Sequence, residues 1–265
     1  MCSVDKGSLN GRRAAAVLGA VVADAAAQPL HWIYDTNKLD NLISQTENIA
    51  FWKPSANPFY CIPTGRQSGY GDQAYVILKS LVENEGLDVR SLKDATFKFF
   101  GPESDYEHPV NATYKEKSDA QKNTFPIKAP WRHFSVKEFL ANHKAGKEHT
   151  GSPTDDQIDC VVRIIPVVAL YAGHPNMLTI AEEVVRITQE SDFTVVVALC
   201  AARILEHFIL NGPSDGVLEE VIKQMDNPHR ANPQELDKAM VGKIREVLQG
   251  KETSHKKMAK QLRID

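Results

Sequence analysis

Apolar residues recur at the spacing of an α-helix along almost the whole chain. Within residues 72–84, for example, they fall on one helical face at Ala74, Ile77, Leu78 and Leu81. The β-branched stretch 193–197 would suit a strand equally well, but the apolar pattern continues to residue 209, and this length favours a helix. The sequence therefore predicts an all-α protein.

Prolines and glycines divide this pattern into separate helices, as at Pro29, Gly86 and Gly173. The sequence predicts helices over residues 11–28, 72–84, 91–100, 135–144, 154–173, 178–188, 192–210, 217–225 and 233–248. Internal repeats, low-complexity tracts and clear linkers are missing from the sequence. We therefore expect a compact orthogonal multi-helix bundle that forms one domain over residues 11–250. A disordered N-terminus, 1–10, would precede it, and a basic C-terminal tail, 251–265, would follow.

Composition narrows the class of protein. The chain has 265 residues, a net charge of −3 and a sequence pI of about 6.3, which argues against a nucleic-acid-binding surface. Its four cysteines lack metal-ligand spacing and fit a reduced, cytoplasmic protein. The apolar run 14–23 imitates a signal peptide, but Asp24 interrupts it, so we expect an internal helix and no membrane span.

A glycine-rich turn, residues 68–73 with the sequence SGYGDQ, carries Asp72 to the start of an apolar helix. The N-terminus of a helix has free N–H groups and partial positive charge, and glycines let a ligand approach the backbone. Asp72 could therefore cap the helix or help to hold a metal ion or a phosphate. Asp155 and Asp156 precede another apolar helix, and the same two alternatives apply to them.

Three other residues lie in unusual surroundings. Asp24 falls inside a helix of small apolar residues, where no cap role is open to it, so it should be paired or face a polar cavity. Arg163 lies within an aliphatic helix and should either form an internal ion pair or reach a phosphate. His31 and Trp32 follow the first helix and could line the same cavity.

Taken in order, these segments resemble the ADP-ribosylglycohydrolase family, especially its branch with the J-type crystallins and selenoprotein J. Residues 13–20 (RAAAVLGA) and 23–27 (ADAAA) resemble the opening helix with its Gly-Asp-Ala-hydrophobic-Gly motif. Residues 70–73 (YGDQ) occupy the place of the family's Thr-Asp-Asp-Thr motif, and residues 163–166 (RIIP) match its Arg-x-x-Pro motif. The resemblance covers roughly residues 11–212.

The resemblance implies a compact all-α hydrolase that uses magnesium to cleave the glycosidic bond of ADP-ribose or of ADP-ribosylated small molecules and proteins. It implies catalytic roles for Asp24, His31 and Asp72, substrate binding by Gly69, Tyr70, Gly71, Gln73 and Arg163, and metal binding by Asp72, with Asp155 and Asp156 as candidates to complete the metal site.

The chain also departs from the family pattern. Tyr70 and Gly71 replace a threonine and an aspartate that are metal ligands in active members, and His31 stands where some members have a catalytic glutamate. The family's C-terminal Asp-x-Asp motif has no counterpart, as in a divergent and truncated member. Two hypotheses follow. The first is a magnesium-dependent hydrolase, and the second is a non-catalytic structural or ADP-ribose-binding protein on the same scaffold.

Overall fold

The computed structural model describes residues 7–44, 46–112 and 124–262. These residues form eleven α-helices, two short 3-10 helices and only two isolated β-bridges. The elements are α1 (Leu9–Ala27), η1 (Gln28–Leu30), α2 (Thr36–Ile43), α3 (Gly69–Glu83), α4 (Val89–Phe100), η2 (Pro109–Asn111), α5 (Phe134–Lys144), α6 (Cys160–Tyr171), α7 (Met177–Arg186), α8 (Asp192–Asn211), α9 (Val217–Asp226), α10 (Asp237–Gln249) and α11 (His255–Leu262). The prediction of an all-α fold is confirmed.

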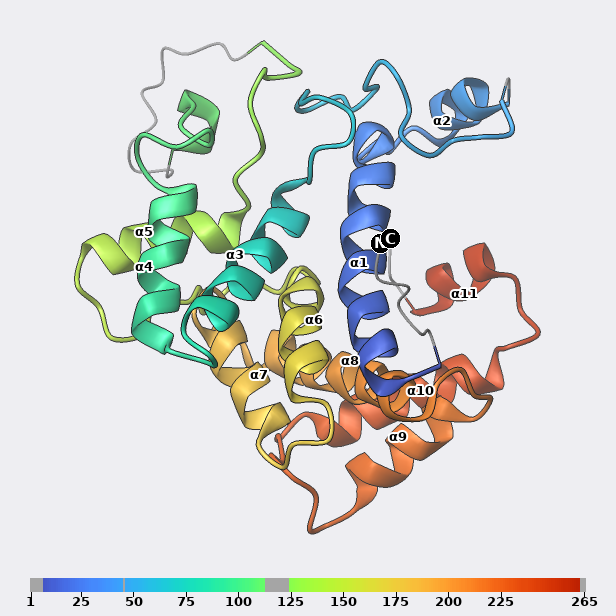
Figure 1. The fold of residues 1–265 in the computed structure, drawn as a ribbon. Helices are drawn as coiled ribbons and strands as arrows, with labels where there is room; N and C mark the ends of the chain where they lie inside the picture. The colour runs from blue at the N-terminus through green and yellow to red at the C-terminus, as the bar shows by residue number, and fades with distance from the viewer. Residues whose placement is uncertain (1–6, 45, 113–123, 263–265) are drawn as a thin grey trace.

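Helix α6 lies at the centre of the bundle. Its aliphatic sequence packs against α1, α3, α7 and α8, and Figure 1 shows α1, α3 and α6 side by side. Ile164, Val167 and Val168 of α6 are almost completely buried in the main core, which also takes in side chains from α3, α4, α5, α7 and α8. Burial of such side chains contributes about 1.5–3 kcal/mol each, so this core dominates the stability of the fold.

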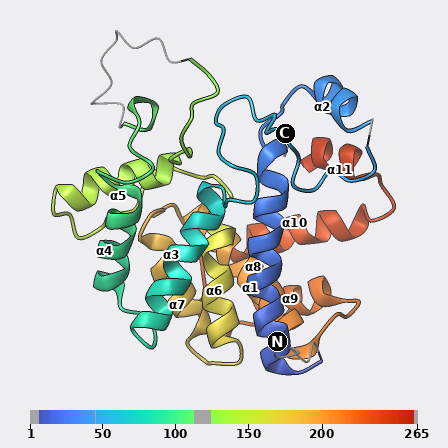
Figure 2. The same ribbon diagram turned by 45° about the horizontal axis from the view of Figure 1, so that its top comes forward.

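Two smaller clusters extend the core at either end. Val196 and Cys200 of α8 pack against Val221, Met225, Val241 and Ile244 of α9 and α10. Figure 2 shows these C-terminal helices beside α8. At the other end, residues from the long segments between helices form an aromatic cluster around Tyr60, which includes Trp32, Phe59 and Trp131. The aromatic cluster gives these irregular segments a core of their own.

Most predicted helix boundaries are close to the observed ones, but two helices begin later than predicted. The helix expected over 233–248 begins at Asp237. The helix expected over 154–173 begins only at Cys160. Residues before it are held in a loop, because the backbone of Ser152 bonds to that of Thr188 and Glu190 on a neighbouring segment. Helix α1 begins at Leu9, while residues 1–6 of the predicted disordered N-terminus lie outside the described residues.

One helix in the described part of the chain, α8, is long and apolar enough to cross a membrane. Half of its most apolar window is buried inside the fold. Core helices of globular proteins have the same properties, and the packing of α8 against α6 and α7 accounts for its composition.

Candidate functional site

The start of α3 is the best-defined part of the site. Ser68, not Asp72, is the N-cap, and its hydroxyl accepts a hydrogen bond from the Tyr70 N–H at 3.1 Å. Gly69 follows in close contact with the 131–133 segment, since a Cβ at this position would meet the Trp131 carbonyl oxygen at 2.7 Å. The capping role considered for Asp72 is therefore wrong. Its carboxylate lies a full turn into the helix and has a different partner.

Asp24 of α1 binds the same cap residue. Its carboxylate accepts hydrogen bonds from the Ser68 N–H at 2.7 Å and from the Ser68 hydroxyl at 2.5 Å. Burial raises the pKa of Asp24, while the hydrogen bonds from Ser68 and Gly71 act in the opposite direction. The expected pairing of this acid is thus observed, and it joins α1 to the start of α3.

The space in which a side chain at position 71 would lie is occupied by Asp24. A Cβ at position 71 would overlap the carboxylate of Asp24 and the side-chain amide oxygen of Gln67. With Asp24 in this place, position 71 has no room for the aspartate that the family pattern has there, and a glycine fits.

We expect Gly71→Ala to lower the free energy of unfolding by about 1–3 kcal/mol, because the added methyl group must displace a hydrogen-bonded carboxylate. Urea denaturation followed by circular dichroism measures this loss. In an Asp24→Ala background, the same change should cost clearly less. Equal costs in the two backgrounds would contradict the contact between these residues.

Asp72 is a buried acid with a raised pKa. Its side chain accepts a hydrogen bond from the Tyr106 hydroxyl at 2.6 Å, and the residue is 8% exposed. Burial raises the pKa of Asp72 to about 6, although the bond from Tyr106 and the charge of Arg66 lower it. This carboxyl group therefore titrates well above the range of an exposed aspartate.

Arg163 is the hub of a buried polar network. Its guanidinium donates to Gln73 at 2.7 Å, to Gln189 at 2.6 Å, to Ser135 at 3.3 Å and to Asp159 at 2.8 Å. Of the two alternatives for Arg163, the structure shows the internal ion pair, made with Asp159 one turn earlier. Arg163 is 1% exposed and Gln73 is 4% exposed. Both lie beneath the surface, and their roles in substrate binding stay predictions.

The candidate metal ligands do not form a metal site. Asp155 is buried in the loop before α6, where one carboxylate oxygen accepts from the Gln157 N–H and the other is unbonded, whereas Asp156 is exposed. Neither caps α6, whose N-cap residue is Asp159. The described residues contain no group of three or more histidine, cysteine, aspartate or glutamate side chains arranged to hold a metal ion. With Gly71 in place of an acid and Asp72 bonded to Tyr106, these residues do not fit magnesium.

Aromatic side chains surround a cavity of about 700 Å³ next to the start of α3. Tyr70 lies against His133 with ring centroids 4.0 Å apart, and against His31 at 5.3 Å. Trp32 adopts a φ of +61°, a strained conformation for a tryptophan. The centroid of its ring lies 5.6 Å from that of Trp131. The cavity is lined by Trp32, Tyr34, Phe59, Tyr70, Trp131, Arg132, His133, Phe134, Lys137, Gln157, Ile158 and Asp159.

The two histidines of this cluster are poor proton acceptors. Burial is the main cause that lowers the pKa of His31 and of His133 to about 4, and each is therefore neutral at pH 7. His31 lies 3.2 Å from the Tyr60 hydroxyl through its Nδ1 atom. The structure thus brings His31 and Tyr70 together near the start of α3, where Gly69 lies against His133 and Gly71 lies against Asp24.

Sequence reasoning missed several residues of this site. Trp131, His133 and Tyr106 lie in or next to the irregular region 103–132, for which no local pattern predicts a position in space. The tripeptide Trp131-Arg132-His133 immediately before a helix was the available signal, because large aromatic residues in a polar segment often belong to a binding surface.

Comparison with known proteins agrees with this fold. The family model for ADP-ribosylglycohydrolase matches residues 6–263, so the chain belongs to the ADP-ribosylglycohydrolase family. Among curated proteins it is similar to Crystallin J1A of Tripedalia cystophora, with 34% identity over 211 residues, and to Crystallin J1B of the same organism, with 33% identity over 216 residues. These matches cover 80% and 82% of this chain but only 62% and 64% of the two relatives.

A solved structure shares the fold at lower sequence similarity. It is described as an ADP-ribosylglycohydrolase-related protein complex, and it matches with a TM-score of 0.55 and 15% identity over 93% of this chain and 77% of the other. The family resemblance seen in the sequence, including its crystallin J branch, is confirmed.

Proposed function

We propose that this chain is a ligand-binding member of its family, which holds ADP-ribose or an ADP-ribosylated group in the aromatic cavity without metal-dependent hydrolysis. The observation that carries the proposal is this cavity at the start of α3, together with the lack, among the described residues, of a side-chain group that could hold a metal ion. Its volume of about 700 Å³ lies within the range of small-molecule sites, about 300–1,000 Å³.

The chemistry of the lining suits a dinucleotide-like ligand. The aromatic side chains of Tyr70, Trp32 and Trp131 line the cavity, and such rings can stack on a planar base. Arg132 and Lys137 also line the cavity, where they donate to backbone carbonyl oxygens of Asn111 and Val110, and their positive charges favour a pyrophosphate group nearby. The negative charge of Asp159, which also lines the cavity, is offset by its ion pair with Arg163.

In this proposal the residues around the cavity bind and position the ligand. None of them transfers a proton to a leaving group. Asp24 is engaged with Ser68, and His31 is neutral and lies beside Tyr60. Asp72 is protonated in part near pH 6 and is bonded to Tyr106. This arrangement favours the non-catalytic hypothesis over the magnesium-dependent hydrolase.

Isothermal titration calorimetry with ADP-ribose tests the proposal. We expect binding that is the same in magnesium and in EDTA, and that Tyr70→Ala weakens by about tenfold or more, because one stacking contact contributes about 1–3 kcal/mol. Tyr75→Ala is the matched control, since Tyr75 lies on the same helix, is 48% exposed and does not line the cavity.

A second measurement separates the competing functions. Chromatography of the products follows the release of ADP-ribose from an ADP-ribosylated arginine peptide. Release that requires magnesium and is lost in Asp72→Ala would establish a hydrolase and overturn the proposal. Absence of any ADP-ribose binding would favour a purely structural protein.

A further inference from the structure

A second cavity, of about 470 Å³, lies between the start of α7, the later part of α8 and the segment that follows α9. It shares no lining residue with the aromatic cavity. Its lining includes Arg203 of α8 and Arg230, with His174 and His229 exposed at its rim. Basic side chains from three separate parts of the chain therefore meet at this cavity.

Arg203 is the unusual member of this group. It is 3% exposed, and its guanidinium donates to the carbonyl oxygens of Leu199 at 3.3 Å and Ala231 at 3.0 Å. Within the described ranges no carboxylate lies within the 4.0 Å of an ion pair with it. Buried charges are normally paired, because an isolated charge loses its hydration without compensation. The positive charge of Arg203 is therefore met at close range by carbonyl oxygens alone, among the described residues.

The nearby acids are engaged elsewhere. Asp237 accepts from the Arg230 guanidinium at 2.5 Å, and Glu206 at the cavity accepts from the Gly173 N–H at 2.8 Å. Both carboxylates act on Arg203 only from a distance. The cavity also borders the first turn of α7, where the partial positive charge of the helix N-terminus adds to that of Arg203.

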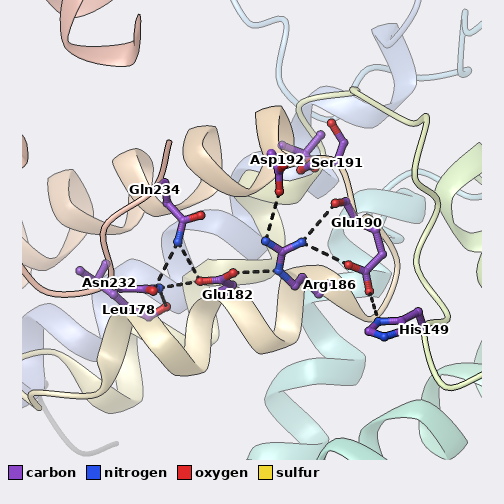
Figure 3. A network of polar contacts seen from close by, with 10 residues as sticks. His149, Leu178, Glu182, Arg186, Glu190, Ser191, Asp192, Asn232 and Gln234 are labelled. Carbon is purple, nitrogen blue, oxygen red and sulfur yellow. Dashed lines mark hydrogen bonds and ion pairs between the residues drawn. The ribbon is translucent and has the colours of Figure 1, made fainter. Parts of the chain in front are cut away.

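The wall formed by the segment after α9 is fixed in place. Figure 3 shows the side chains of Asn232 and Gln234 donating to the carboxylate of Glu182 on α7, at 2.8 and 2.9 Å. The Arg186 guanidinium forms an ion pair with the same carboxylate, with its Nε 2.8 Å from the other carboxylate oxygen. The cavity is therefore preformed, which lowers the entropic cost of binding a ligand.

We propose that this cavity binds a small organic phosphate, whose phosphate group contacts the guanidinium of Arg203. A guanidinium presents a planar set of donors that matches phosphate oxygens. The volume leaves room for an organic part beside the phosphate, and the side chains of Met177 and Leu178 offer that part an apolar wall. The site is independent of the aromatic cavity and of the function proposed for it.

Calorimetry with ribose 5-phosphate, inorganic phosphate and ribose tests the proposal. We expect ribose 5-phosphate to bind, inorganic phosphate to bind more weakly and ribose not to bind. Arg203→Lys should weaken ribose 5-phosphate at least tenfold, because an ammonium keeps the charge but loses the planar geometry. Tyr75→Ala, at an exposed residue that lines neither cavity, should leave this binding unchanged.

Two further variants keep the test decisive if Arg203→Lys fails to fold. His229→Glu places a negative charge at the exposed rim and should also weaken binding at least tenfold. Arg245→Ala removes an exposed guanidinium that pairs with Asp226 outside the cavity and should change nothing. Equal affinity of wild type and His229→Glu, or binding of citrate in preference to ribose 5-phosphate, would overturn the proposal.

Discussion

Replacing Arg163 by leucine is expected to destabilise the protein by about 3–5 kcal/mol. The substitution leaves the Asp159 carboxylate buried without its ion-pair partner and removes donors from Gln73, Gln189 and Ser135. Because Arg163, Gln73 and Asp159 are all buried, water replaces few of the lost bonds. Urea denaturation of wild type and variant at pH 7.5 measures the difference.

Two comparisons identify the cause of this loss. Arg245→Leu removes one ion pair of similar length, 2.7 Å, but its side chain is 53% exposed, so we expect a loss of about 1 kcal/mol or less. Adding Asp159→Asn to Arg163→Leu should recover part of the stability, because the unpaired charge is then gone. An Arg163→Leu variant as stable as the Arg245→Leu control would contradict the role of Arg163 as the hub of the network.

Asp72→Asn is expected to stabilise the protein at pH 7.5 by as much as roughly 3 kcal/mol, and this gain should disappear by about pH 4. Burial raises the folded-state pKa of Asp72 from 3.8 to about 6. Between these values the folded protein keeps a proton that the unfolded chain has released, so the contribution of Asp72 to stability falls as the pH rises. The penalty is complete above about pH 6. Asparagine carries no charge at any pH, so it avoids this penalty.

The measurement is the difference in unfolding free energy between variant and wild type from pH 4 to pH 8. His31 and His133, whose pKa values burial lowers to about 4, destabilise both proteins in acid, and their effect cancels in the difference. Asp105→Asn is the control, because its side chain is 70% exposed and pairs with Arg66 on the surface. A constant difference between Asp72→Asn and wild type at all pH values would show that Asp72 does not titrate as described.

The positions of the helices could be predicted well from the sequence, but the residues that cap α3 and α6 could not. The apolar period of residues 72–84 depends only on nearby residues, which is why α3 was found. The role of Asp72 depends on Tyr106, which is far along the chain and reaches the acid only in the folded protein. Likewise, Asp155 lies in a loop because residue 152 pairs with the segment 188–190, and no local signal contains that information.

For the site residues, too, the sequence indicated which residues are unusual but not which partners they have. Asp24 could be recognised as an acid that needs a partner, because an unpaired charge in an apolar helix is costly, but the partner itself, Ser68, could not be named. For Arg163 both alternatives were open, and only the packing of α3, α5 and α6 shows that its donors are used inside the protein.

The sequence by itself determined the helical class, the approximate helix boundaries, the family and the few polar residues that matter, since each follows from local pattern or residue type. Only the tertiary structure decided which partners those residues have. It placed Asp24 where an aspartate at position 71 would have to lie, bonded Asp72 to a tyrosine and built an aromatic cavity from distant segments. The physical reason is that hydrogen bonds, burial and pKa shifts depend on contacts between residues far apart in the sequence. Such contacts cannot be read from local sequence patterns.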